Sequence, residues 1–397
     1  MSTPSPELQQ VIRDLEAALG EETLAKGRLR VRLEIAQFLT SLLAPLLLAL
    51  LWLPTGWAVS LRNALQANST WWRTWLAVAV FAVSSRVFIH IPLAWFFEFR
   101  TENLLGTNRQ TLGGWLGDEA RQAAIDILTL SLLYLGLYLV FRHWPHLWLL
   151  GMSVIVILFV GILVLISPWL MRMQNKAEPL DDPELTTRLR QLFEHAGVPF
   201  GNISVLKTSE KSSTLGASLV PKGAGTEVVV TDTLLEAMTP EEVADVVAHE
   251  LGHKVHHDWP KSIAVLGFAL IVTLAAGYWA VQALGHWDGL QGATDVATLP
   301  ILMLAASWGG KITQAGINAY LRRTEYAADR FALETTHRPD VFEKVMVMLA
   351  RQNQTLPQPP AWIECCLRAH PSTAKRVLMA RQWGKQHGGS PPDSSRP

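Results

Sequence analysis

The sequence has little charge and almost no cysteine, and each scarcity excludes a class of protein. Charged residues make up 17% of the 397 positions, and 34 basic residues balance 34 acidic ones, so the formal net charge is zero. A neutral chain lacks the basic surface that binds a polyanion, so we expect no nucleic-acid partner. The two cysteines, Cys365 and Cys366, are adjacent, which leaves no disulfide framework and no CxxC metal pair. We expect reduced thiols on a helix.

Long apolar runs are absent before Ile35 and frequent afterwards. No cleavage site follows the first run, so we do not expect a cleaved signal peptide. Hydrophobic residues reach 49% of the chain and tryptophan occurs 16 times, which indicates membrane embedding. Runs of about 20 residues can cross a hydrocarbon core. Six runs are close to that length: Ile35–Leu53, Trp75–Phe97, Ala123–Phe141, Leu147–Leu170, Ile263–Leu284 and Leu299–Ile317.

The most specific motif is His249-Glu250-Leu251-Gly252-His253. Its helix begins at Thr239-Pro240, with a capping hydroxyl, a proline and then two acidic residues. Two imidazoles four residues apart project from one helix face and can hold one Zn²⁺. Glu250 is adjacent and can accept a proton from a water that the metal activates. The pattern predicts a hydrolytic zinc site, with peptide bonds as the usual target. A chance match on a solvated helix is the alternative.

A third zinc ligand must come from another part of the chain. The histidines at 256 and 257 lie about two turns, roughly 11 Å, along the axis, which is too far for one ion. Residues 318–332 read as a helix on which Glu325 and Asp329 share a face. Glu325 would complete a His₂Glu set with an open fourth position, and Asp329 could fix the tautomer of a ligand imidazole. Without the HExxH motif, an exposed helix with Arg–Glu pairs would be preferred.

The stretch between the fourth and fifth runs reads as a soluble insert. A helix is predicted from Asp182 to Ala196, with Gly197 as its stop. An edge strand beside a zinc helix can bind an extended peptide by adding it to the sheet, although a hairpin that only covers the helix is an equally good interpretation. The predicted strands are Ile203–Lys207, Leu215–Pro221 and Glu227–Thr231, the last two joined by a four-residue hairpin loop, Lys222–Gly225.

Three other features carry weaker signals. Arg86 and His90 lie one turn apart in the second run, and ionisable groups in a span are expected to face a polar interior, with snorkelling as the alternative. His370 precedes a proline and by itself reads as a loop residue, while Ser372 caps a final helix. The tail from Gly384 is rich in Gly, Ser and Pro and is predicted to be disordered.

Basic residues predict the orientation of the spans. Arg100, Arg109 and Arg121 lie between the second and third runs, whereas Gly285–Thr298, between the fifth and sixth, has no Lys or Arg. Basic segments stay in the cytoplasm, so both termini and the HExxH helix are predicted to be cytoplasmic.

Together these segments predict a mainly α fold, a polytopic membrane helix bundle of about six spans with a small α+β HExxH domain. An amphipathic cytoplasmic helix precedes the first span, and its apolar stripe consists of Leu8, Val11, Ile12, Leu15 and Leu19. The predicted segments are the cytoplasmic helix (1–34), four spans (35–172) with a cytoplasmic loop at 98–122, the soluble zinc-protease insert (173–261), two spans (262–318), cytoplasmic helices that complete the active site (319–383) and the tail (384–397).

Four blocks, in order over most of the chain, resemble the CAAX prenyl protease type I family of integral-membrane zinc metalloproteases, which are related to the bacterial HtpX proteases. The first block, 98–111 followed by Trp115 and Asp118, is similar to the family's cytoplasmic stretch between spans two and three and favours the CAAX type over HtpX. The others are the HExxH motif, the stretch 318–329, and His370-Pro-Ser with Arg376. HExxH alone is moderately specific, and four blocks in order are highly specific.

The resemblance implies a fold and a zinc centre. The family fold is a ring of membrane helices around a large water-filled chamber, capped by the zinc domain; Arg86 and His90 would face that chamber. One Zn²⁺ per chain would be bound by His249, His253 and Glu325.

The resemblance also implies roles around the metal. Glu250 would be the catalytic base, Asp329 would pair with a ligand histidine, His370 would donate to the oxyanion, and Arg376 would support His370 or the substrate. Four further positions would bind substrate or line the active site, namely Asn318, Arg322, Gly216 and Ala217.

The chain departs from the family pattern away from the metal set. Gly216-Ala217-Ser218 stands where Asn-Ala and an aromatic are usual, which removes a side-chain contact to substrate but leaves backbone pairing possible. Leu321 replaces a Ser and Ala369 a Thr. Eukaryotic members have seven spans, against the six expected here.

We therefore expect an integral-membrane zinc endopeptidase that cleaves peptide or protein substrates, lipidated or not, near the cytoplasmic membrane face. The Trp- and Arg-rich, short-looped sequence suggests a bacterial inner membrane, where membrane protein quality control or peptide processing is as good an expectation as CAAX cleavage. The first alternative is a membrane chaperone or scaffold that binds lipidated or hydrophobic peptides without turnover; Glu250 argues against it, because a binder needs no base. A transporter is weaker, since the spans lack paired broken helices in repeated halves.

Overall fold

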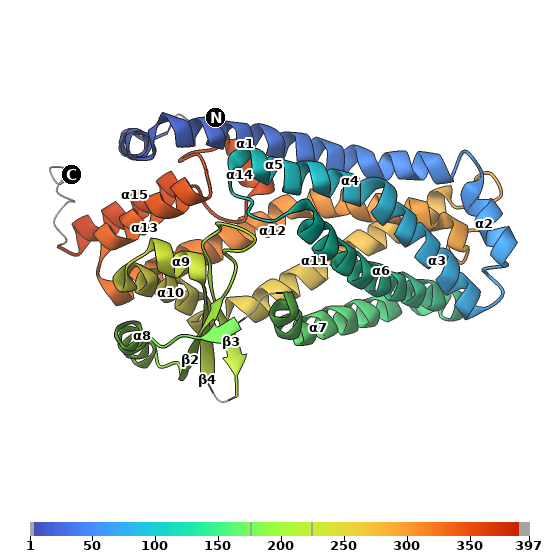
Figure 1. Ribbon diagram of the computed structural model, residues 1–397. Coiled ribbons are helices and arrows are strands. Elements are labelled where there is room, and N and C mark those ends of the chain that lie inside the picture. The colour runs from blue at the N-terminus through green and yellow to red at the C-terminus, as the bar shows by residue number, and fades with distance from the viewer. Residues whose placement is uncertain (1–3, 175–176, 224, 389–397) are drawn as a thin grey trace.

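The computed structural model describes residues 4–174, 177–223 and 225–388. Long helices dominate it, and within these ranges six helices are long and apolar enough to cross a membrane. They lie side by side as a bundle, with the sheet and the shorter helices at one end and the short helix α2 (Trp57–Leu65) at the other (Figure 1). The predicted mainly α bundle of six spans is confirmed.

The spanning segments are longer than the apolar runs that predicted them. Helical turns of polar residues extend each apolar run, because a helix can continue for as long as its backbone hydrogen bonds are made. The second span is interrupted by two π-helical segments around Pro92, which lacks a backbone N–H. The elements of the bundle are α1 (Pro6–Trp52), α3 (Trp71–Ser85), α4 (Ile91–Ala94), α5 (Thr101–Leu105), α6 (Leu112–His143), α7 (Trp148–Gln174), α11 (Asp258–Leu284) and α12 (Leu299–Thr336).

A cavity of about 510 Å³ lies inside the bundle, between α1, α3, α6 and α12. Arg86 and His90 are both among its lining residues, so these two ionisable side chains face the inside of the bundle as expected. Arg86 is buried and pairs with Glu119 and, at 3.0 Å, with Asp126. A buried charge in a membrane needs such partners, and Asp126 lines the same cavity as Arg86.

The N-terminal segment is continuous with the first span but changes direction at Gly20, whose φ of 76° and ψ of 161° are not helical. Before this kink, Val11 and Leu15 are buried in the core of the soluble end. They pack with α13 (Pro339–Gln352) and α15 (Thr373–Gln386). The predicted apolar stripe therefore contacts protein.

The insert contains a helix and a mixed sheet. Helix α8 (Pro183–His195) is capped by Asp182, which accepts a hydrogen bond from the backbone N–H of Leu185, and Gly197 follows it with a φ of 66°, as predicted. The strand order is β1-β2-β4-β3, with β2 and β4 parallel and the other pairs antiparallel. The strands are β1 (Ala177–Pro179), β2 (Phe200–Leu206), β3 (Ala217–Lys222) and β4 (Gly225–Thr231).

Three details of the soluble end differ from the sequence predictions. Strand β1 was not predicted, because three exposed residues carry no alternation. The β3–β4 hairpin is tighter than a four-residue loop, since Lys222 pairs directly with Gly225. Residues 384–386 of the predicted tail belong to α15, where Gly384 packs on Pro339, and residues 387 and 388 follow this helix directly. The remainder of the predicted tail, 389–397, lies outside the described residues.

Helix α12 extends from the sixth span into the soluble domain without a break and crosses α10 (Pro240–Val255) there. The crossing is close at Gly252. A Cβ atom added to Gly252 would lie 2.9 Å from Cα of Ala328 and 3.1 Å from Cβ of Phe331. The two helices can therefore approach to this distance only because residue 252 has no side chain.

Gly252→Ala tests this crossing. Overpacking at a rigid contact typically costs about 1–3 kcal/mol, so the variant should show a lower thermal midpoint and weaker metal binding in detergent. Gly316→Ala on α12 is the control, because no atom of the described residues lies within 4 Å of its added Cβ. Equal thermal midpoints for the two variants would contradict the prediction.

Candidate metal and active site

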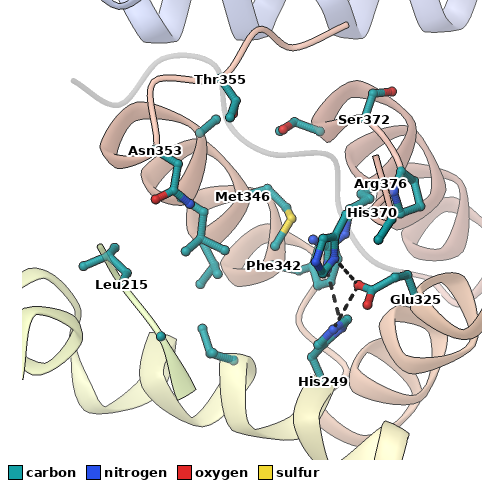
Figure 2. Close-up of a pocket in the computed structure, with 18 of the residues that line it drawn as sticks. Leu215, His249, Glu325, Phe342, Met346, Asn353, Thr355, His370, Ser372 and Arg376 are labelled. Atoms are coloured by element: carbon teal, nitrogen blue, oxygen red, sulfur yellow. Dashed lines mark hydrogen bonds and ion pairs between the residues drawn. The ribbon is translucent and has the colours of Figure 1, made fainter. Parts of the chain in front are cut away.

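Three ligand atoms converge where α10 crosses α12. His249 and His253 project from α10, and buried Glu325 projects from α12. One ligand atom from each lies within 4.8 Å of the others. The Nε2 atoms of both histidines lie 3.4 Å from carboxylate oxygens of Glu325. Figure 2 shows His249 and Glu325 facing each other at the floor of the pocket. The geometry fits a His₂Glu zinc site.

Two further carboxylates hold the other nitrogens of the two rings. Nδ1 of His249 lies 2.8 Å from Asp329, which is fully buried, and Nδ1 of His253 lies 2.9 Å from Asp258, the first residue of α11. A carboxylate at Nδ1 fixes the ring so that Nε2 is free to bind a metal. Both rings are thus oriented toward Glu325.

Sequence reasoning found Asp329 but missed Asp258. Asp329 lies one turn after Glu325, so helical spacing places it near the same ring. Asp258 lies five residues after His253, across the turn at His257, whose φ is 52°. No regular spacing applies across such a turn. The only available signal was an acidic residue directly after the motif helix.

Arg376, from α15, contacts the carboxylate network. Its Nε donates to Asp329 at 2.8 Å, its Nη2 also bonds to Asp329, and Nη2 lies 3.4 Å from Nδ1 of His249. The guanidinium thus makes a bidentate contact that orients Asp329, and support of His370 or the substrate by Arg376 stays a prediction. The guanidinium also balances the charge of the buried Asp329.

The electrostatic environment favours a bound cation. Burial disfavours the charged imidazole of His249, but its bonds to Asp329 and Glu325 outweigh this and raise its pKa to about 9. Burial raises the pKa of Glu250 above its usual range, although His249 and His253 counteract this. Burial also raises the pKa of Asp245, one turn before His249, to about 7. A base near the metal with a raised pKa suits proton transfer near neutral pH.

A cavity of about 640 Å³ opens above the metal ligands. His370 lies on its rim with 67% of its side chain exposed, and its Nδ1 lies 2.7 Å from Glu325 (Figure 2). The structure therefore brings His370 to the metal centre. The cavity is also lined by Glu250, Arg376 and apolar side chains, among them Leu234, Phe342 and Met346.

Strand β3 forms the other side of the cavity. Ala217, the first residue of β3, and Gly216, the residue before it, both line the cavity. On the side of β4, the carbonyl of Gly216 accepts from the backbone N–H of Thr231, and the N–H of Gly216 donates to the hydroxyl of Thr231. Because β3 is last in the strand order, its other edge is not paired within the sheet. Backbone pairing with an extended peptide is therefore geometrically available there.

The stretch between spans two and three lies against the segment before β3. The backbone N–H of Arg109 donates to Lys211, and that of Ser213 donates to Thr107. Asp118 accepts from Nζ of Lys211 at 2.6 Å. These contacts attach the membrane bundle to the strand that borders the cavity.

Asn318 and Arg322 are near the site but do not line the cavity. Nδ2 of Asn318 donates to the carbonyl of Cys366 at 2.8 Å, and Nη1 of Arg322 donates to the carbonyls of Glu364 and Arg368. Both side chains thus bind the backbone that leads to His370. The resemblance implied instead that they line the active site.

Comparison with known proteins agrees with this geometry. The model of peptidase family M48 matches residues 179–384, more than half of the chain. This chain belongs to peptidase family M48. A second model, the CAAX prenyl protease N-terminal region with five membrane helices, matches residues 5–173. The protein is therefore a membrane-embedded M48 metalloprotease of the CAAX protease type, a family whose metal is generally zinc.

Individual relatives support the same assignment. The M48 protease is 28% identical to an uncharacterized metalloprotease YhfN of Bacillus subtilis over 74% of this chain and 70% of the relative. It is 23% identical to a CAAX prenyl protease 1 homolog of Caenorhabditis elegans, over 77% of each. The crystal structure of S. mikatae Ste24p matches its fold with a TM-score of 0.74 at 18% identity, over 96% of this chain and 100% of that one.

Removing either orienting carboxylate should weaken zinc binding by about 10–100-fold, because the imidazole loses its fixed orientation. Asp329→Ala and Asp258→Ala can be compared with wild type by chelator competition. Asp340→Ala, an exposed position on α13, is the control. Full zinc occupancy of a variant after dialysis against a mild chelator would exclude its carboxylate from this role.

Zinc affinity should also increase with pH. The metal-free protein carries a proton on His249 below pH 9, and the metal binds only the neutral ring, so binding must displace that proton. We expect apparent affinity to rise about tenfold per pH unit between pH 7 and 8.5, with proton release in calorimetry. A pH-independent affinity would contradict the raised pKa.

Proposed function

We propose that this M48 protease is a zinc-dependent endopeptidase that cleaves peptide bonds near the cytoplasmic face of the membrane. One observation carries the proposal: His249, His253 and Glu325 converge, and His249 and Glu325 line, together with Glu250, a cavity bordered by an edge strand. Metal ligands, a base and a peptide-binding edge are the three parts that metal-assisted peptide hydrolysis requires.

Each residue then has a defined role. His249, His253 and Glu325 would bind one zinc, which when bound polarises the scissile carbonyl and activates water. Glu250 would accept the proton of the attacking water and pass it to the leaving amine. His370, exposed on the cavity rim beside Glu325, would donate a hydrogen bond to the developing oxyanion. Arg376 and Asp329 would hold His249.

Strand β3 would position the substrate. An extended peptide paired with the edge at Gly216 and Ala217 would lie over the metal ligands, because both residues share the cavity with His249. Glycine and alanine offer no side chain that recognises substrate, so this contact would rest on the backbone and tolerate different sequences. The preceding segment is occupied by the bridge between Asn108 and Ser212. The paired peptide would therefore end on that side.

The basic segments support a location of the active site on the cytoplasmic side. Arg100, Arg109 and Arg121 flank the second and third spans at the end that contacts the soluble domain, which favours a cytoplasmic active site. A metalloprotease of Bacillus subtilis is similar over most of its length, which supports a bacterial inner membrane. In that setting, quality control of membrane proteins or peptide processing is the expected role.

Prenylated CAAX substrates are the other possibility for the same chemistry. Relatives from Caenorhabditis elegans and Saccharomyces cerevisiae are named CAAX prenyl proteases. The cavity inside the bundle is lined mostly by apolar residues, including Leu48, Val78 and Leu130. Such a lining is compatible with a lipidated peptide. Substrate preference must therefore be measured.

A scaffold that binds hydrophobic peptides without turnover remains the second candidate. The apolar cavity favours it, but Glu250 does not. Glu250 lines the active-site cavity beside the two histidines and is not needed to bind either metal or peptide. A base retained at that position is explained by catalysis.

Glu250→Gln should keep one zinc per chain and lose at least about 100-fold in kcat, since general-base catalysis contributes about 10²–10⁴-fold. Wild type and variant would be purified in detergent, assayed for zinc, and incubated with a farnesylated CAAX peptide and its unprenylated counterpart. Glu236→Gln, an exposed carboxylate on α9 (Asp232–Ala237), is the matched control.

The outcomes separate the candidates. Cleavage by wild type and the Glu236 control, but not by Glu250→Gln, supports the protease, and the preferred peptide then defines the substrate class. Absence of zinc, or equal cleavage by wild type and Glu250→Gln, would leave the scaffold as the better explanation.

A further inference from the structure

Four polar residues form one stripe along α12. Asn318, Arg322, Glu325 and Asp329 are spaced by four, three and four positions, so they lie on one face of the helix. The last two serve the metal centre directly: Glu325 faces the histidines and Asp329 orients His249. The first two contact a different part of the chain, and their role is not explained by the metal.

Arg322 holds the end of α14 (Ala361–Leu367). One nitrogen, Nη1, lies 2.8 Å from the carbonyl oxygen of Glu364, 3.2 Å from that of Cys365 and 2.7 Å from that of Arg368. These carbonyls belong to the last turn of α14 and its C-cap, where no intrahelical donor is available. A cation there also complements the negative end of the helix dipole.

Asn318 supplies the remaining bond to the same turn. Its Nδ2 donates to the carbonyl of Cys366 at 2.8 Å, and its Oδ1 accepts from Gln314 at 2.8 Å. Asn318 is 1% exposed, so its amide is committed to these partners and is not available to a peptide in the cavity. The two side chains thus bond to four carbonyls between Glu364 and Arg368.

The loop that follows is held at its other end by Glu364. This buried carboxylate accepts from the backbone N–H of Ser372 at 3.1 Å and from Nζ of Lys375 on α15 at 2.9 Å. In addition, the side chain of Arg368 binds both carboxylate oxygens of Glu34 on α1, each at 2.9 Å. Residues 368–372 are therefore a short bridge with both ends fixed.

His370 lies in the middle of this bridge. Its ring is mostly exposed, and its ion-pair contact is with Glu325. Because the ring is mostly exposed, packing does little to fix its position. The position of His370 over the metal ligands therefore depends on how the two ends of the bridge are held. One of those ends is attached to the helix that also bears Glu325.

We propose that Arg322 and Asn318 are positioning residues, which set His370 against the metal centre by fixing the end of α14. The inference rests on the proposed function and assigns to these two residues a role without substrate contact. One face of α12 then carries both the metal ligand Glu325 and the two residues that hold the segment bearing His370. The distance between His370 and the metal ligands is therefore set by this helix. A displacement of His370 by about 1 Å can cost as much as 100-fold in rate.

Kinetics of Arg322→Met, His370→Ala and the double variant provide the test. His370→Ala should lower kcat by about 10²–10³-fold. Arg322→Met should lower kcat by about 10–100-fold with KM and zinc content unchanged, because ground-state binding is not involved. The double variant should be no slower than His370→Ala, since Arg322 acts only through that residue. Arg323→Met, at the exposed neighbouring position, is the control.

Other kinetic results would overturn the inference. If the losses from Arg322→Met and His370→Ala multiply in the double variant, Arg322 acts independently of His370. If Arg322→Met raises KM and leaves kcat intact, it contacts substrate. Asn318→Ala removes one hydrogen bond to the end of α14, whereas Arg322→Met removes three. It should therefore give a smaller loss of kcat, again with KM unchanged. This variant keeps the test available if Arg322→Met fails to fold.

Hydrogen exchange gives a readout that does not require activity. In Arg322→Met, backbone amides of residues 366–374 should exchange faster than in wild type, whereas Arg323→Met should match wild type. Unchanged exchange in Arg322→Met would refute the anchoring. A wild-type protein with zinc that cleaves no peptide would instead refute the proposed function, and the exchange result would still show whether the bridge is anchored by Arg322.

Discussion

The crossing of α10 and α12 is the constraint on which the rest of the site depends. Each helix by itself fixes only the spacing of its own side chains. A metal site needs groups from both at a separation of a few ångströms, and the backbones can approach that closely because Gly252 presents no side chain to Ala328 and Phe331. The motif glycine is thus part of the metal centre without contacting the metal. Any change in the crossing moves Glu325 relative to the histidines.

The site is also prepared electrostatically before a metal binds. Glu325, Asp329 and Asp258 surround two imidazoles, and their combined negative charge would be unfavourable in a buried location without compensation. Part of it is balanced by Arg376, which bonds to Asp329 with two nitrogens. Although burial disfavours the charged ring, Asp329 and Glu325 raise the pKa of His249, and such an environment favours a bound cation. The carboxylates that orient the rings are therefore also the groups whose negative charge stabilises a bound cation.

Helix α12 joins this chemistry to the membrane bundle. It lines the cavity between the spans through Leu299 and Met303, and it carries Glu325 and Asp329 beyond the span. The contact of Glu34 on α1 with Arg368 gives a second link between a span and the bridge that holds His370. Residues on a rigid helix keep fixed distances from one another, so the packing of the spans also fixes where the active-site residues lie.

The sequence by itself determined the six spans, the HExxH helix and its His₂Glu partner, because apolar run length and helical spacing are local properties. It also indicated Asp329 and the edge strand. Only the tertiary structure decided that Asp258 holds His253, that Arg376 bonds to Asp329, and that Asn318 and Arg322 bond to the end of α14. These contacts join residues across turns or between distant elements, and no periodicity encodes which of several exposed partners the packed chain brings together.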